Sequence, residues 1–263
     1  MKKFLDTMKT FQFLLLMSTF CLSLSILPQT GLSQSENATE IIRKADKKQR
    51  GDYSQGEMKM SIIRPDWTRE TTMKMWSYQD DLSLILVTAP ARDQGTAFLK
   101  RFKEMWNWQP SIDRTIKMPP SMMSQSWMGS DFTNDDLVKQ SSMVVDYTHE
   151  ITGEDDLEGR PCWEITLTPK DDAAVVWGKV ITWIDHKDYL QLKTEFYDED
   201  DYLVNTMTAK EITDLGGRIL PRIMEMVPAD EEGHMTKIEY LSLDFSKPIK
   251  ESFFSVRNMQ KVR

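Results

Sequence analysis

Cysteine and histidine are scarce in this sequence, which has 2 cysteines and 3 histidines among 263 residues. Cys21 lies within the first 33 residues, so Cys162 alone would remain without them, and one cysteine cannot form an internal disulfide. The glycine patterns Gly-x-Gly-x-x-Gly and Gly-x-x-x-x-Gly-Lys, which bind nucleotides, do not occur, nor does the hydrolase pattern Gly-x-Ser-x-Gly. The sequence therefore gives no reason to expect a cofactor, and the fold has to rest on its hydrophobic core.

Residues that could bind a metal or carry out catalysis also form no known pattern. Each histidine lies at or near a predicted turn or strand end, where a solvated side chain is more common than a general base. Asp131, Asp135 and Asp136 are close in sequence, but they lack the spacing and turn glycine of a calcium-binding loop, so we interpret them as helix-capping residues. We predict no metal site and no enzymatic activity, although groups that meet only in space leave no pattern in a sequence.

The first 33 residues have the three parts of a secretory signal peptide. Three lysines precede residue 10, an apolar run covers residues 11–27, and small residues occupy the positions that a signal peptidase recognises. We predict cleavage near Ser33 and export of residues 34–263 to the periplasm as a single domain. The alternative is a retained membrane anchor, because roughly 17 apolar residues are at the short limit for spanning a bilayer.

Acidic residues outnumber basic ones in the predicted mature chain. Residues 34–263 contain 30 lysines and arginines against 40 aspartates and glutamates, a net charge of −10. Such a surface repels phosphate backbones, so nucleic acid is not an expected partner. A length of about 230 residues suits one domain with one core, and we expect a monomer.

Methionine and tryptophan are abundant where cysteine is scarce. Residues 34–263 hold 15 of the 18 methionines and all 8 tryptophans. Methionine is flexible and polarizable, and methionine-rich surfaces repack around varied apolar partners. The excess therefore suggests an apolar binding surface, with ordinary core filling as the alternative.

The periodicity of the chain changes after one helix. The pattern over residues 40–50 predicts a helix that ends at Gly51. Beyond it, apolar residues recur at every second position, as in Met58, Met60 and Ile62, and short polar segments separate the runs. This pattern predicts a mainly β fold of about ten or eleven antiparallel strands joined as a meander.

Residues 119–132 interrupt the strand pattern. This segment contains three methionines, a tryptophan and a phenylalanine, which cannot all face water. We predict that it folds as a lid over one face of the sheet. Thr133 and Asp136 resemble a capping box, with aspartate in place of the usual glutamate, and predict a short helix from 134 to about 140.

Several motifs resemble one family. They are Gly95–Lys100, Met105-Trp106, Trp183–Asp185 and above all Ser-Trp-Met-Gly-Ser-Asp-Phe-Thr-Asn-Asp-Asp-Leu over residues 126–137. The chain resembles the bacterial outer-membrane lipoprotein-sorting-like proteins, which are related to the periplasmic carrier LolA. The resemblance covers residues 34–263 and implies an incomplete β-barrel, in which a strongly curved antiparallel sheet wraps helices on its concave face. It also implies a cavity for acyl chains and transfers no catalytic residue.

Apolar side chains on the predicted strands and lid are the candidates for lining such a cavity. They are Met58, Met60, Met73, Met75, Leu84, Leu86, Trp106, Trp108, Met122, Met123, Trp127 and Met128. A shift of one residue in strand register would move a strand's candidates to the other face.

Three functions remain open at this point. The first is a periplasmic carrier that binds lipid or lipoprotein acyl chains for sorting towards the outer membrane, with an inner-membrane transporter as donor and an outer-membrane acceptor. The second is a non-enzymatic accessory module that docks on an envelope transporter, with a fully packed interior. The third is an enzyme that acts on envelope lipids, which would require a buried carboxylate or histidine facing the cavity.

Overall fold

The computed structural model describes residues 37–79, 81–138, 142–173 and 175–263. The predicted signal peptide lies outside the described residues and stays a prediction. None of the helices in these ranges has the length and hydrophobicity that a membrane-spanning helix needs.

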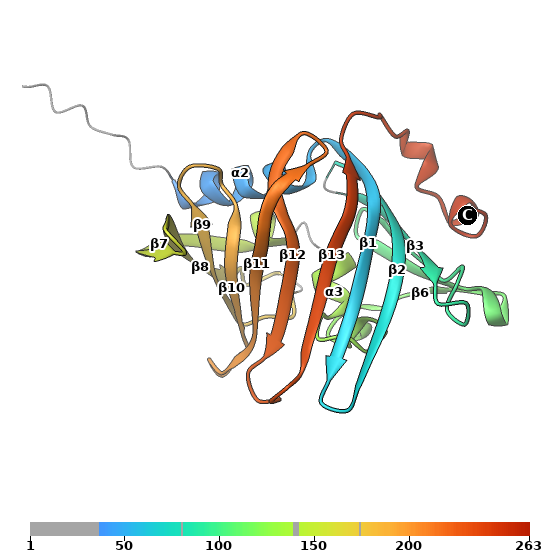
Figure 1. The fold of residues 1–263 in the computed structure, drawn as a ribbon, viewed down its shortest axis with the longest axis horizontal. Coiled ribbons are helices and arrows are strands. Elements are labelled where there is room, and N and C mark those ends of the chain that lie inside the picture. Colours follow the sequence, from blue (N-terminus) through green and yellow to red (C-terminus); the bar gives the residue numbers. More distant parts are fainter. Residues whose placement is uncertain (1–36, 80, 139–141, 174) are drawn as a thin grey trace, which may run out of the picture. The chain divides into compact units, whose positions relative to one another are not determined.

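One antiparallel sheet dominates the described part of the chain (Figure 1). Its thirteen strands lie in the order β6-β5-β4-β3-β2-β1-β13-β12-β11-β10-β9-β8-β7, and the sheet is not closed into a barrel. The strands are β1 (Tyr53–Arg64), β2 (Trp67–Tyr78), β3 (Leu82–Ala89), β4 (Ala97–Arg101), β5 (Glu104–Gln109), β6 (Arg114–Lys117), β7 (Tyr147–Leu157), β8 (Arg160–Pro169), β9 (Lys179–Asp185), β10 (Gln191–Tyr197), β11 (Leu203–Leu215), β12 (Arg218–Pro228) and β13 (Met235–Asp244).

The predicted fold class is confirmed, with more strands than the ten or eleven expected. Strands without apolar alternation account for the difference. The edge strand β7 carries Glu150, Glu154 and Asp155, which are exposed, and β6 has only 4 residues. Neither strand shows the half-buried pattern from which strands are recognised in a sequence.

The predicted first helix is also confirmed, as α2 (Ala38–Arg50). Asn37 caps its start by accepting a hydrogen bond from the Thr39 backbone N–H, and Gly51 follows its end with a positive φ of 69°. At the carboxyl end, the Arg218 guanidinium donates to two helix carbonyls at 3.1 and 3.3 Å. This cation also complements the negative end of the helix dipole, so α2 is fixed at both ends.

The remaining helices are short. They are α3 (Asn134–Val138), α4 (Ser142–Val145), α5 (Val256–Met259) and 3-10 turns at Pro110–Ile112, Pro120–Met122, Trp127–Gly129 and Glu251–Phe253. We call residues 119–138, which include α3, the lid segment. Figure 1 shows α2 and α3 on the same side of the sheet, behind the strands in this view.

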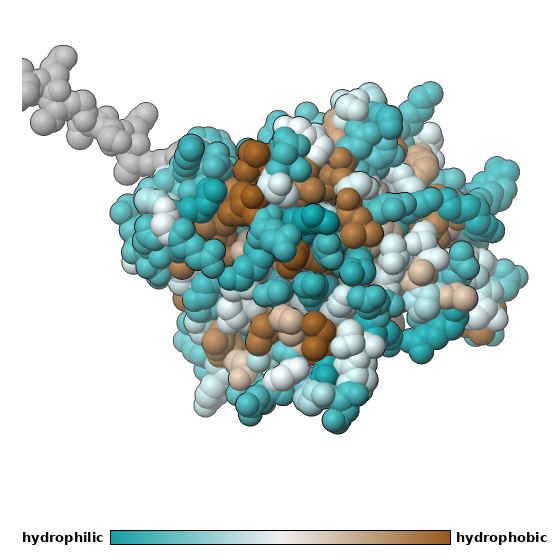
Figure 2. Space-filling view, viewed as in Figure 1, coloured by the Kyte–Doolittle hydropathy of each residue, from teal (hydrophilic) through white to brown (hydrophobic). Residues whose placement is uncertain are grey.

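Three groups of buried apolar residues hold the structure together. The first lies between the sheet, α2 and the lid segment, and the second joins β3 and β4 to the chain's last residues, including Phe254 and Met259. The third includes Cys162, whose thiol has its pKa raised to about 11 because burial disfavours the thiolate. The sheet face seen in Figure 2 is mostly hydrophilic, with separate hydrophobic groups between hydrophilic residues.

Candidate ligand-binding cavity

A cavity of about 210 Å³ lies between the sheet, α2 and the lid segment. Ile42 and Ala45 face it from α2, and Phe132 faces it from the lid segment. Strands from both halves of the sheet complete the wall, because their alternate residues point towards α2 and the lid segment. The cavity thus occupies the side of the sheet on which a cover and an apolar face were predicted.

Methionine makes up much of the apolar wall. Met58, Met75, Met207, Met224 and Met226 line the cavity, and they come from β1, β2, β11 and β12. Met207 and Met226 are cross-strand partners. Because methionine side chains are unbranched and rotate readily, this wall can adapt to the shape of an apolar guest.

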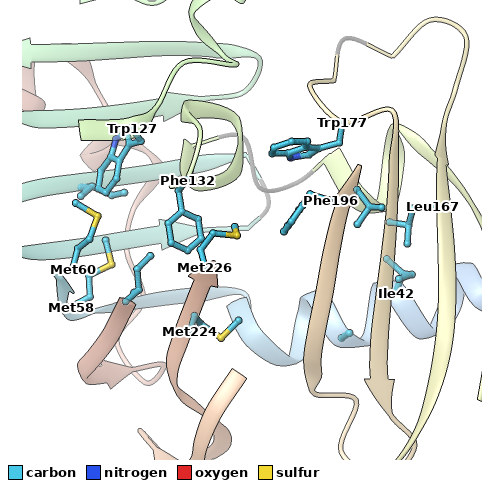
Figure 3. Packing of buried hydrophobic residues seen from close by; sticks show 14 of the residues in the cluster. Ile42, Met58, Met60, Trp127, Phe132, Leu167, Trp177, Phe196, Met224 and Met226 are labelled. Carbon is cyan, nitrogen blue, oxygen red and sulfur yellow. The ribbon is translucent and has the colours of Figure 1, made fainter. Parts of the chain in front are cut away.

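Aromatic side chains close the cavity beneath the lid segment. The ring centroids of Trp177 and Phe196 are 5.1 Å apart, and Figure 3 shows both near Phe132 and Met226. Trp177, Phe132 and Phe196 are all buried. Trp177 belongs to the connection between β8 and β9, so this end of the cavity is built from segments far apart in the sequence.

A buried carboxylate ties Trp177 to the lid segment. Trp177 Nε1 donates to Asp136 Oδ1 at 2.9 Å. The other oxygen of Asp136 accepts from the Thr133 backbone N–H at 2.7 Å, and Thr133 Oγ1 accepts from the Asp136 backbone N–H at 3.1 Å, so the predicted capping box is confirmed. Burial raises the pKa of Asp136 to about 6, and the hydrogen bonds from Thr133 and Trp177 limit the rise.

A second buried carboxylate anchors the lid segment to the sheet. Asp131 accepts two hydrogen bonds from Arg64 of β1, at 2.7 and 3.1 Å, and one from the Thr236 hydroxyl of β13 at 2.6 Å. The side chains of Arg64 and Asp131 are only 11% and 6% exposed. This pair accounts structurally for the aspartate in the Ser-Trp-Met-Gly-Ser-Asp-Phe motif.

The rest of that motif shapes the docked lid. Met128 and Gly129 have φ values of 53° and 76°, in the left-handed region that glycine adopts without strain. This turn directs the Met128 carbonyl to the Arg69 guanidinium, which donates to it. The preceding Trp127 is fully buried and packs against Phe98, with ring centroids 5.2 Å apart. The lid segment is therefore a closely docked cover.

The structure places eight of the twelve sequence-predicted candidates on the side of the sheet with the cavity or in its lid. Met58 and Met75 line the cavity. Met60, Met73 and Trp127 are buried in the same apolar group without lining it. Met123 and Met128 pack against that group, and Met122 is half-buried, with its carbonyl accepting from Asn134.

The other four candidates lie on the opposite face, in or against the second apolar group: Leu84, Leu86, Trp106 and Trp108. In β3 the side chains that face α2 and the lid segment are those of Ile85 and Val87. Because β3 is apolar on both faces, alternation alone did not determine its orientation. The two tryptophans of β5 lie on the same face as Leu84, because Trp106 pairs with Leu99 and Leu99 pairs with Leu84.

Sequence reasoning missed much of the cavity wall. The lining from α2 and from the second half of the sheet includes Ile42, Val180, Ile184, Phe196 and Met224. The strand residues do alternate in the sequence, which was a usable signal. Trp177 had no such signal, because it lies between strands and meets Asp136 only after folding.

An open antiparallel sheet that holds an apolar cavity under an amino-terminal helix and a lid is the LolA-like fold, and the resemblance seen in the motifs is confirmed at this level. A domain assigned to outer membrane lipoprotein sorting from Vibrio parahaemolyticus has a similar structure, with a TM-score of 0.76 and 22% identity over 85% of this chain and 98% of that chain. A DUF1329 family protein from Desulfovibrio piger gives 0.77 and 23% over 85% and 98%. A LolA superfamily protein from Nitrosomonas europaea gives 0.73 and 21% over 85% and 99%.

The family itself follows from a comparison of sequences. A family model with the description "Uncharacterized protein" matches residues 79–261, which is more than half of the chain, and the chain belongs to that family. None of the curated proteins matches the chain.

Proposed function

We propose that the protein is a periplasmic carrier that holds an acyl chain of a lipid or lipoprotein in the cavity, for sorting towards the outer membrane. The observation that carries the proposal is the space of about 210 Å³ between α2, the lid segment and a methionine-rich wall. Apolar pockets with few polar groups are the usual binding sites for such ligands.

The size of the cavity sets the length of chain that it can take. A space of 150 Å³ binds benzene, so about 210 Å³ has room for roughly eight carbons. At about 0.8 kcal/mol for each buried methylene, the gain is roughly 6 kcal/mol before ordering costs. Because ordering the ligand reduces this gain, the dissociation constant would be no tighter than tens of micromolar, which suits a ligand that must also be released. Rotation of the methionines would admit a longer chain.

One prediction and one structural similarity support the location and the role. The predicted signal peptide would bring the protein to the periplasm, where lipid traffic between membranes takes place. Two of the similar structures carry names that refer to lipoprotein sorting or to LolA. Holding an acyl chain involves no covalent chemistry, so the proposal assigns no catalytic residue. An inner-membrane transporter as donor and an outer-membrane acceptor belong to the same proposal.

Displacement of a fluorescent acyl probe tests the proposal. We expect Met224→Phe to weaken probe binding at least tenfold, because the larger ring would occupy the cavity. Val227→Phe is a matched control on the same strand, since Val227 is 42% exposed and does not line the cavity. If wild type does not bind the probe, or if both variants bind it equally, the interior serves only as core and the accessory-module function is favoured.

A further inference from the structure

One end of the cavity has a polar wall. Strand register places Ser54 beside Ser77, Ser77 beside Ser83, and Ser83 beside Lys100, so the four side chains form one row across β1, β2, β3 and β4. All four line the cavity. We call them the polar row.

The facing part of α2 is polar as well. Asp46, Gln49 and Arg50 line the same cavity, and Arg50 Nε donates to Asp46 Oδ1 at 2.6 Å. Gln79, just after β2, also lines the cavity and is exposed. The polar end therefore reaches the surface beside the end of α2, whereas the opposite end lies beneath the buried Trp177.

Polarity changes sharply along the strands. Two residues further into β2 and β3, the cavity is lined by Met75 and Ile85 in place of Ser77 and Ser83. Two residues of a strand span about 7 Å, so the change occurs within one row of side chains. A ligand that fills this cavity from its mouth would contact the polar row first and a more apolar wall beyond it.

The polar row has hydrogen-bonding capacity to offer. Ser54 Oγ and Ser77 Oγ bond to each other at 2.7 Å, and each hydroxyl can make further hydrogen bonds. Within the described residues, the half-buried hydroxyl of Ser83 has no hydrogen-bond partner. Polar groups removed from water are costly unless they are hydrogen-bonded, so this row would favour a ligand that supplies a polar group at the mouth.

The charges on the lining favour a head group without net charge. Arg50 and Lys100 contribute positive charge, Asp46 and Asp135 contribute carboxyl groups, and Arg50 and Asp46 form an ion pair. An anionic or cationic head would meet groups of its own sign as well as opposite ones. A head that both donates and accepts hydrogen bonds matches hydroxyl, amide and charged groups together.

We propose that the polar row and the end of α2 form a head-group site for a single-chain amphiphile whose head is uncharged and hydroxyl-bearing, as in a monoacylglycerol. Its acyl chain extends past Met75 towards Met224. This inference rests on the proposed function, and it adds the class and the orientation of the ligand.

Three ligands of equal chain length test the inference by calorimetry on the purified mature protein below their micellar concentrations. They are 1-decanoylglycerol, methyl decanoate and sodium decanoate. We expect 1-decanoylglycerol to bind at least tenfold more tightly than the other two. Ser77→Ala/Ser83→Ala should remove most of that preference, because the two lining hydroxyls that would bond the head group are lost. Ser242→Ala, an exposed serine of β13 outside the cavity, is the control.

Each other outcome overturns a distinct claim. Tighter binding of sodium decanoate would overturn the uncharged head. Equal binding of the three ligands, or a preference unchanged in the double variant, would overturn the head-group site while leaving the carrier proposal intact. Absence of binding by all three would contradict the carrier proposal itself. Thermal unfolding of each variant, compared with that of wild type, would show whether it is folded.

Discussion

Each face of the sheet has an apolar region that lies under a cover, but the two covers differ. On one face, α2 and the lid segment cover a methionine-rich wall and leave a cavity of about 210 Å³. On the other, the last residues of the chain cover β3 and β4, and Leu84, Leu99, Phe254 and Met259 are all fully buried. Covering an apolar sheet does not by itself create a binding site. The difference lies in whether the cover follows the strand surface closely or leaves space above flexible side chains.

Fixed contacts hold both covers. Arg101 donates to the Phe254 carbonyl at 2.9 Å and to Glu251 at 2.8 Å, which seats the carboxyl-terminal segment. Asp131 and Arg64 seat the lid segment. The space above the methionines therefore persists in the presence of a firmly held cover, as a preformed binding site requires.

Truncating one buried residue on each face should give the largest difference in the free energy of unfolding. We expect Phe254→Ala to reduce the free energy of unfolding by about 4 kcal/mol, because it empties a filled site. Met224→Ala should cost only about 2 kcal/mol, because Met224 already borders open space. Urea unfolding measures both changes. Equal losses would show that the two faces are packed alike.

Breaking the lid anchor should have the next largest effect. Asp131→Ala leaves Arg64 nearly buried without its carboxylate partner, and we expect a loss of about 3 kcal/mol. Arg64→Met together with Asp131→Ala should recover part of this loss, because no uncompensated charge remains. Glu40→Ala, which removes the exposed pair with Arg43, is the control and should cost less than about 0.5 kcal/mol.

The raised pKa of Asp136 should make the stability of the fold decrease as the pH rises. Its pKa is raised from 3.8 to about 6, so its contribution to stability is complete below pH 3.8 and is lost as the pH rises through 6. The shift corresponds to no more than about 3 kcal/mol. Asp136→Asn should remove this dependence between pH 4 and 6.5, as measured by urea unfolding at several pH values. An unchanged profile would show that Asp136 is solvated.

Titration of His149 should change the stability of the fold in the opposite direction to titration of Asp136, and by the smallest amount of the changes predicted here. Burial lowers its pKa, so it stabilises the fold when neutral, and its contribution decreases as the pH falls through 6.5. The ring bonds to Thr39 Oγ1 at 3.0 Å and to the Met143 carbonyl at 2.7 Å, which joins α2, α4 and β7. His149→Asn should make the free energy of unfolding, measured with urea, less dependent on pH between pH 5 and 7.

The elements that the sequence predicted well are those with local signals. The helix that ends at Gly51 and the capping box of Thr133 and Asp136 depend on neighbours within four residues, and both are present. Alternation identified the sheet because most of its strands are buried on one face. The apolar composition of residues 119–132 indicated a cover for the same reason.

The elements that escaped prediction depend on register or on contacts between distant segments. Leu84 and Ile85 are equally apolar, so only the packed sheet decides which one faces α2. Trp177 meets Asp136 across 41 positions of the chain. The polar row exists only when four strands are aligned, because Ser54, Ser77 and Ser83 are ordinary serines in the sequence.

Mass spectrometry of organic extracts from the purified protein tests the central claim most directly. The cavity account predicts that a molecule bearing an acyl chain co-purifies with the wild type and with Val227→Phe, and is strongly depleted from Met224→Phe. Recovery of no acyl-bearing molecule above the level found with an unrelated periplasmic protein, or equal recovery from both variants, would contradict it.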